Sequence, residues 1–140
     1  MNQSTITQTT TITSTERQVV IKATTAYLTE MTEMNAVLEH TGGGCEALGL
    51  YPNEPAATPW YIWLTDDASV WSSVEDLLRC ESIVIGVYRD GGDWSGEADA
   101  MFYADNWTQV VDHIRRVQNC LLPNGSLDMG KLEALVANDT

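Results

Sequence analysis

The first hydrophobic pattern in the chain has the spacing of an amphipathic helix. Thr13 and Glu16 stand three positions apart, as in a capping box, where two side chains bond the free backbone amides of a helix start. The β-branched residues at 19–21 and 24–25 lower helix propensity, so a strand over the first half stays open. The pattern predicts a helix that ends at the glycines of positions 42–44, with one stripe of Val20, Ala23, Tyr27, Met31, Met34 and Leu38 and, largely opposite, Lys22, Thr25, Thr29, Thr32 and Glu33.

Two strands are predicted after these glycines, over residues 45–51 and 60–65. Prolines in the intervening segment keep the connection out of regular structure. The second strand has two apolar faces, one made of Trp60, Ile62 and Leu64 and the other of Tyr61 and Trp63. This strand therefore either lies in the centre of a sheet or presents one face to an interface.

The strongest strand pattern lies over residues 82–88, where Ile83, Val84 and Ile85 follow one another. A partner strand is predicted over residues 97–104, across a turn that begins at Asp90. The two segments are expected to form a hairpin.

Three further helices are predicted. A short one over residues 74–80 follows a second capping box at 72–75. The next is capped by Asp105 or Asn106, and a last helix covers about 127–136. The apolar stripe of the middle helix is Val110, Ile114 and Val117, with Trp107 beside it.

The resulting order of elements, α-β-β-α-β-β-α-α, predicts an α+β fold with a four-stranded antiparallel sheet and helices packed on one face. Residues 1–15 are too polar to pack and are expected to form a flexible Thr-rich arm. Residues 16–140 then form a single acidic domain, since 140 residues and 44% hydrophobic content suffice for one core.

Charge narrows the choice of partners. The chain has 20 acidic and 7 basic residues, a formal net charge of -13, and no Lys or Arg between Lys22 and Arg79. Direct binding to nucleic acid or to an anionic membrane requires a basic footprint and is disfavoured. Such a surface attracts basic protein surfaces, although solubility or adaptation to high salt also explains the excess. With no long apolar run and no signal-like N-terminus, the expected location is the cytoplasm.

The best candidate for chemistry is the glycine-rich turn at residues 40–45, where His40 and Cys45 flank the glycines. It lacks the Lys-Ser/Thr of a phosphate-binding loop and follows a predicted helix, so a helix C-cap is the favoured interpretation. A catalytic Cys45–His113 pair and a metal site at His40 and Cys45 have no supporting spacing. No cofactor, metal or enzymatic activity is expected, and buried Cys80 and Cys120 fit a reducing compartment.

Acidic and aromatic residues supply the candidate binding site. The acids of the predicted hairpin lack the order of a calcium loop and are expected to form a solvated turn. Six Trp and Tyr residues (Trp60, Tyr61, Trp63, Trp71, Trp94 and Trp107) are many for one small core, and such rings are enriched at interfaces. Most are expected to line the core, with Trp94 exposed. The candidate partner-binding residues are Trp60, Trp63, Asp66, Asp67, Asp90, Asp93, Trp94, Glu97 and Asp99.

Three stretches carry a resemblance to a known class of proteins: residues 39–45, Thr65-Asp66-Asp67, and residues 83–88. Over roughly residues 35–110 the chain resembles small acidic accessory proteins of actinobacterial phages. The resemblance implies a protein that works by binding host or virion proteins, and it supplies no catalytic residues.

The leading functional hypothesis is therefore a phage-type accessory protein that binds and inhibits a host protein with a basic surface. Its acidic surface would engage the partner and its aromatic side chains would anchor the contact. Two alternatives stay open. The acids could mimic a nucleic-acid backbone and block a host nuclease or a restriction or CRISPR-type complex, or the chain could be a virion or homo-oligomeric structural protein.

Overall fold

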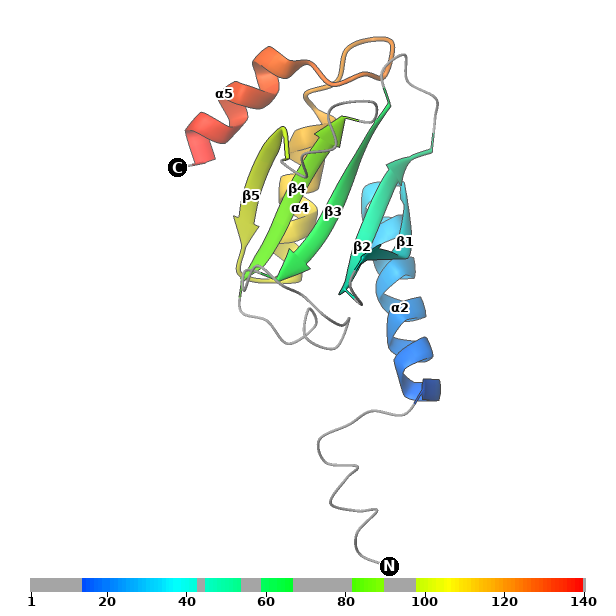
Figure 1. Ribbon diagram of the computed structural model, residues 1–140. Coiled ribbons are helices and arrows are strands. Elements are labelled where there is room, and N and C mark those ends of the chain that lie inside the picture. Colours follow the sequence, from blue (N-terminus) through cyan, green and yellow to red (C-terminus); the bar gives the residue numbers. More distant parts are fainter. Residues whose placement is uncertain (1–13, 43–44, 54–58, 67–81, 90–97, 140) are drawn as a thin grey trace, which may run out of the picture.

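The computed structural model describes residues 14–42, 45–53, 59–66, 82–89 and 98–139. Within these residues the chain has an α+β fold, as predicted, with one antiparallel sheet and helices packed against it (Figure 1). The predicted Thr-rich arm falls largely outside the described residues. The elements are α2 (Ser14–Thr32), β1 (Met34–Gly42), β2 (Cys45–Pro52), β3 (Trp60–Asp66), β4 (Ile83–Arg89), β5 (Ala100–Ala104), α4 (Trp107–Gln118) and α5 (Met129–Asp139).

The sheet is a meander whose strands lie side by side in chain order, from β1 to β5. The predicted count of four strands is wrong, because the described residues form five and the added strand is β1. β3 lies in the middle of the sheet. A central position is one of the two possibilities predicted from its two apolar faces, the other being an interface on one face. The hairpin is confirmed, since Ile83 pairs with Ala104 and Val87 with Ala100. The short helix predicted over 74–80 lies outside the described residues.

The largest correction concerns the end of the first helix, which stops at Thr32 and not near residue 38. Glu33 adopts a left-handed backbone with φ 60°, and its amide donates to Thr29 O at 2.9 Å. Two threonine hydroxyls then accept hydrogen bonds from backbone amides of β1. Thr32 Oγ1 accepts from Met34 N and Thr29 Oγ1 from Ala36 N, each at 3.2 Å. These bonds turn the chain back along the helix as β1.

Side chains of α4 bind the last carbonyls of α2. The Arg115 guanidinium donates to Met31 O through Nε at 3.2 Å and Nη2 at 3.0 Å. Gln118 Nε2 donates to Thr32 O at 2.5 Å. The final carbonyls of a helix have no partner within it, and a cation near them is also favoured by the helix dipole. Side chains of a helix distant in the sequence therefore satisfy the last carbonyls of α2.

The buried face of α2 also differs from the predicted stripe. Leu28 and Thr32 are buried, whereas Ala23 and Tyr27, both assigned to the stripe, are exposed. Threonines pack on this face because their hydroxyls bond carbonyls one turn back. These bonds run from Thr24 to Val20 O, from Thr25 to Ile21 O and from Thr32 to Leu28 O, at 2.6–2.9 Å. The β-branched residues are thus accommodated in a helix.

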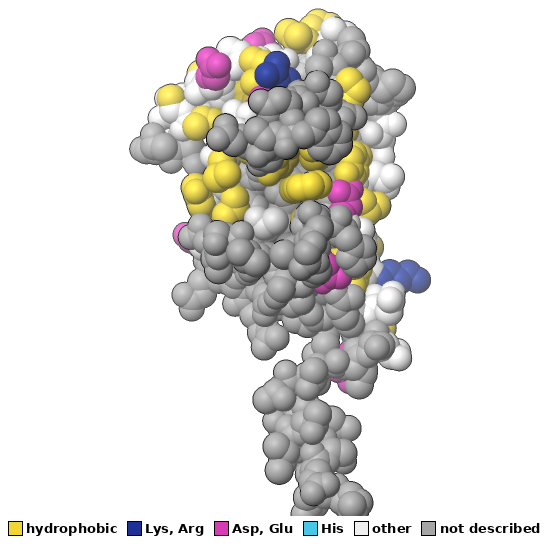
Figure 2. Space-filling view, in the orientation of Figure 1, with side chains coloured by type: hydrophobic (Ala, Val, Ile, Leu, Met, Phe, Trp, Pro, Cys, Tyr) yellow, Lys and Arg dark blue, Asp and Glu magenta, His cyan; other side chains and the backbone are white. Residues whose placement is uncertain are grey.

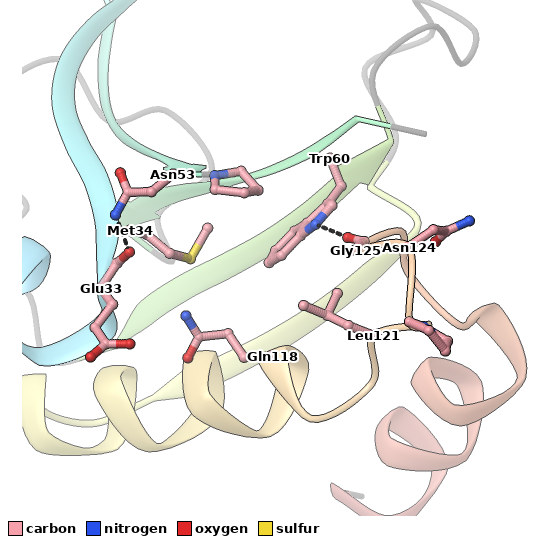
Figure 3. A pocket seen from close by; sticks show the side chains of 10 residues that line it. Glu33, Met34, Asn53, Trp60, Gln118, Leu121, Asn124 and Gly125 are labelled. Atoms are coloured by element: carbon pink, nitrogen blue, oxygen red, sulfur yellow. Dashed lines mark hydrogen bonds between the residues drawn. The ribbon is translucent and has the colours of Figure 1, made fainter. Parts of the chain in front are cut away.

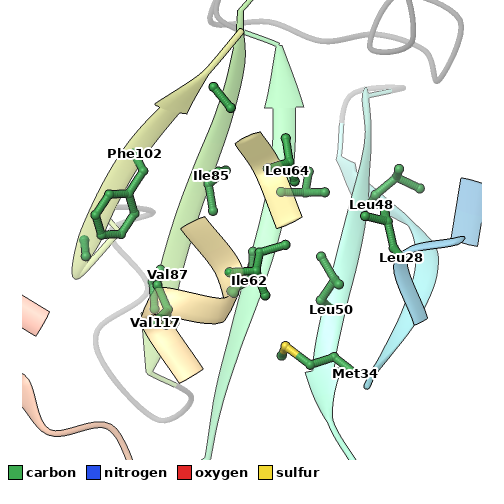
Figure 4. Packing of buried hydrophobic residues seen from close by; sticks show 14 of the residues in the cluster. Leu28, Met34, Leu48, Leu50, Ile62, Leu64, Ile85, Val87, Phe102 and Val117 are labelled. Carbon is green, nitrogen blue, oxygen red and sulfur yellow. The ribbon is translucent and has the colours of Figure 1, made fainter. Parts of the chain in front are cut away.

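The core lies between the sheet and the two helices α2 and α4, which cover the same face (Figures 1 and 4). The predicted stripe of α4 is confirmed, with Val110, Ile114 and Val117 fully buried. Asn106 is the N-cap, accepting from Gln109 N at 2.9 Å. The strands contribute residues of one parity, among them Met34, Leu48, Leu50, Ile62, Leu64, Ile83, Ile85, Val87 and Phe102.

A turn leads from α4 to α5, the predicted last helix, which packs beside β5. Gly125 in this turn has φ 84°, a conformation that favours glycine. Cys120 is a buried free cysteine, as expected, and burial raises the pKa of its thiol. The Cys45 side chain and Cys80 lie outside the described residues. None of the described helices combines the length and the apolar composition needed to cross a membrane.

Candidate functional site

The sheet has a second face, here named the outer face, which lies opposite α2 and α4 (Figure 1). Because side chains alternate along a strand, one parity fills the core and the other lines this face. Figure 2, in the same orientation, shows hydrophobic side chains gathered over the strands with acidic groups beside them. The described side chains of the outer face include Val37, Glu39, Tyr51, Tyr61, Trp63, Thr65, Val84, Tyr88, Met101 and Tyr103.

Four aromatic rings in the middle of the outer face form one cluster, here named the aromatic cluster: Tyr51, Tyr61, Trp63 and Tyr88. Tyr61 stacks between the other two tyrosines, with ring centroids 5.6 Å from Tyr51 and 5.2 Å from Tyr88. Trp63 is tilted by 56° against Tyr61 and Tyr88, at 5.7 and 5.4 Å. The rings come from three adjacent strands, so the sheet register creates the cluster.

Two glycines beside Trp63 make room for the side chains of Glu39 and Tyr88. Gly49 and Gly86 flank Trp63 as its direct partners on β2 and β4. A Cβ at Gly49 would come within 2.7 Å of Glu39 Oε1, and one at Gly86 within 2.8 Å of Tyr88 Cε2. The Glu39 carboxylate and the Tyr88 ring therefore lie flat against backbone that only glycine leaves open.

Glu39 reaches across β2 and accepts hydrogen bonds from two members of the aromatic cluster. Trp63 Nε1 donates to its Oε2 at 2.9 Å, and the Tyr51 hydroxyl donates to its Oε1. Burial, the hydrogen bond to Glu39 and the charge of Glu39 raise the pKa of Tyr51 to about 12. Burial also raises the pKa of Tyr88. A negative charge is thus held among neutral aromatic groups.

The rim of the outer face is apolar and exposed. Val37 on β1 is 37% exposed, and Met101 and Tyr103 on β5 are 44% and 53% exposed. Together with the aromatic cluster, they place an apolar or aromatic side chain of the outer face on each of the five strands. Surfaces of this kind mark contacts with other molecules, and Tyr and Trp are the residues enriched there.

The structure separates the two predicted anchors of β3. Trp63 lies in the aromatic cluster, whereas Trp60 faces the core, is only 3% exposed and donates its indole N–H to Gly125 O at 3.2 Å. Asp99 binds Arg89, accepting from its backbone amide at 2.8 Å and from Nη2 at 3.2 Å. The Asp66 side chain and Asp67, Asp90, Asp93, Trp94 and Glu97 lie outside the described residues.

The glycine-rich turn does not cap a helix, contrary to expectation. It joins β1 to β2, where Gly42 pairs with Cys45 and the register of the two strands shifts between His40 and Gly42. The error follows from the misplaced helix end. His113 lies on the opposite side of the sheet, buried and stacked on Phe102 with ring centroids 5.3 Å apart. Within the described residues no group of three His, Cys, Asp or Glu side chains is placed to hold a metal ion.

Sequence reasoning missed Glu39, Tyr51 and Tyr88 as site residues. A signal for them was present, because Gly49 and Gly86 each interrupt an apolar strand and leave no side chain on the outer face. A glycine inside a strand often marks a position where another group approaches the backbone closely. Which groups do so depends on the pairing of β1 with β2.

A pocket of about 600 Å³ lies at the end of the sheet, on the core side (Figure 3). Three of its side-chain donors already have partners within the protein: the Trp60 indole bonds Gly125 O, the Asn53 amide bonds Glu33 O and the Gln118 amide bonds Thr32 O. A ligand would find few unused donors there. The outer face is the better supported candidate site.

Comparisons with protein-family models, with curated proteins and with solved structures found no match. Inferences about function therefore depend on the chemistry of the outer face and on the sequence.

Proposed function

We propose that this protein is a small acidic accessory protein of the phage type, which binds another protein through the outer face of its sheet. The partner is a host protein with a basic surface, and binding blocks that surface. The observation that carries the proposal is the aromatic cluster with Glu39 bound at its β1 side, bordered by exposed Val37, Met101 and Tyr103.

The composition of the outer face supports protein binding. Large rigid rings lose little conformational freedom when they are covered, and they commonly supply the residues that dominate binding energy. Tyr51, Trp63 and Tyr88 are partly exposed on one continuous surface. A protein surface is the natural match for an apolar area that extends across five strands.

The charge of the chain supports a basic partner. A formal net charge of -13 accelerates encounter with a positive surface and disfavours acidic partners. Among the outer-face side chains named above, Glu39 is the single carboxylate. Mimicry of a nucleic-acid backbone would need rows of acids, and the described side chains of this part of the surface do not form such rows. The sequence resemblance supports the phage-type origin and the binding role, and the inhibitory role is part of the proposal.

The proposal is tested by capture from a lysate of the cells in which the chain is naturally produced. The bait is the wild-type protein, a Tyr103→Arg variant of the outer face, or a Val19→Arg control on α2, where Val19 is 61% exposed. We expect a specific protein that wild type and control retain at about 0.15 M salt and that Tyr103→Arg loses.

Two results would contradict the proposal. Equal capture by all three baits would place the contact away from the outer face, and capture of no specific protein at low or moderate salt would leave it without a partner. Light scattering separates the structural alternative. If wild type is an oligomer and Tyr103→Arg is a monomer, the outer face joins copies of this chain.

A further inference from the structure

The Glu39 carboxylate occupies an uncommon position for a charged group. It lies above Gly49 on the surface of the sheet, with donors from Tyr51 and Trp63 on its two oxygens. Each carboxylate oxygen can accept about two hydrogen bonds, so an acceptor position is left on both as far as the described residues are concerned. Within the described residues, the ion pairs of Arg89 with Asp99 and of Arg116 with Asp112 do not involve Glu39.

We infer that Glu39 and the aromatic cluster form a subsite for an arginine side chain of the partner protein. This inference rests on the proposed function and names the chemistry that the outer face recognises. The guanidinium pairs with the Glu39 carboxylate and lies against the ring of Trp63.

A cation satisfies two features of this site at once. The donors that the described residues give this partly buried carboxylate, Tyr51 and Trp63, are both neutral. When a docking protein displaces water from the carboxylate, a cation on that protein compensates the lost hydration better than a neutral group does. The faces of Trp and Tyr rings also attract cations, most strongly where water is excluded. Glu39 and Trp63 therefore act on the same ligand group.

Arginine fits this subsite better than lysine. Its guanidinium is planar, can place two N–H donors on the two oxygens of one carboxylate, and stacks on aromatic rings. Glu39 offers one acceptor position on each oxygen, and Trp63 is tilted by 56° from its neighbours. The lysine ammonium is a compact, strongly hydrated charge that loses more water on entry.

The test uses small probes and the full-length protein. The Trp63 indole N–H signal, assigned by its loss in a Trp63→Phe protein, is followed by NMR during titration with the N-acetyl amides of arginine, lysine and citrulline. Citrulline has nearly the shape of arginine without its charge. We expect millimolar binding of the arginine probe, about threefold weaker binding of the lysine probe, and no saturable shift with citrulline.

Matched variants locate the effect. Glu39→Gln should weaken arginine binding roughly tenfold. Glu133→Gln, which removes the same charge from an exposed position of α5, should leave it unchanged. Tyr51→Phe deletes one donor to the carboxylate and keeps its charge, so it should weaken arginine binding less than Glu39→Gln does. The amide spectrum of each variant shows whether it is folded. If Glu39→Gln is unfolded, the comparison of the arginine and citrulline probes on the wild-type protein still tests the inference.

The inference is overturned if arginine and citrulline shift the Trp63 signal equally, if lysine binds as tightly as arginine, or if Glu39→Gln and Glu133→Gln weaken binding by the same factor. Its failure differs from failure of the proposed function. If the arginine probe has no effect while a captured protein still depends on Tyr103, the outer face binds its partner without this subsite.

Discussion

Replacement of Arg115 by alanine should destabilise the protein measurably, although the side chain is exposed. Arg115 donates twice to Met31 O and so satisfies a carbonyl at the end of α2. The neighbouring Arg116 provides a matched control, because it lies in the same turn of α4 and its described partner is Asp112, four residues earlier, at 2.7 Å. Both substitutions remove one positive charge from α4.

The expected difference follows from the two sets of contacts. A hydrogen bond from a charged donor contributes about 1.5–3 kcal/mol when water is excluded, and exposure of Arg115 reduces this to about 1 kcal/mol. An exposed pair four residues apart on a helix, such as Arg116 with Asp112, contributes about 0.3–0.5 kcal/mol. Arg115→Ala should therefore lower the free energy of unfolding about twice as much as Arg116→Ala and lower the Tm by about 3 °C.

The assay is urea denaturation followed by circular dichroism, with hydrogen exchange as a local readout. In Arg115→Ala the amide of Glu33, which closes the last turn on Thr29 O, should exchange faster, whereas Arg116→Ala should leave it unchanged. Equal losses of stability in the two variants, with equal exchange at Glu33, would refute the claim that α4 holds the end of α2.

Other predictions test the sheet and the buried groups. Ile85→Ala, on the core face of β4, should cost about 3 kcal/mol of unfolding free energy in urea denaturation, and Val84→Ala on the outer face less than about 1 kcal/mol. The pKa of Tyr51 is about 12 in the folded protein and near 10 in the unfolded chain, so the unfolded chain releases this proton first. The free energy of unfolding should therefore fall as the pH rises from about 10 to 12. In urea denaturation at each pH, Tyr51→Phe should lack this part of the decline. Cys120, buried and with a raised pKa, should react with iodoacetamide only as fast as the protein unfolds, measured by mass spectrometry with and without urea.

Sequence reasoning succeeded where a local signal and the burial pattern agree. The helix after Asn106 has both a capping residue and a stripe that holds only at helical spacing, and both are confirmed. The hairpin of β4 and β5 follows from a β-branched run and an alternating partner across a turn. The two apolar faces of β3 pointed to a central strand or an interface, and the structure makes the strand central. These features depend on residues close together in the chain.

The sequence pattern failed at the boundary between α2 and β1 because its spacing was ambiguous. Met34 and Leu38 are four residues apart, which fits one face of a helix and equally one face of a strand. The left-handed residue that ends the helix is a glutamate, so the usual glycine signal is absent. The last carbonyls of α2 are bound by Arg115 and Gln118, which lie more than eighty positions later in the chain.

The candidate site divides in the same way. Sequence alone indicated that Trp63 lies on a second apolar face of its strand and that the chain suits a basic partner, because alternation and net charge need no knowledge of contacts. Only the tertiary structure showed that Trp60 faces the core and that Glu39, Tyr51 and Tyr88 lie next to Trp63 in one cluster. Those contacts cross three strand boundaries, and the register that aligns Gly49 and Gly86 with Trp63 is a property of the assembled sheet.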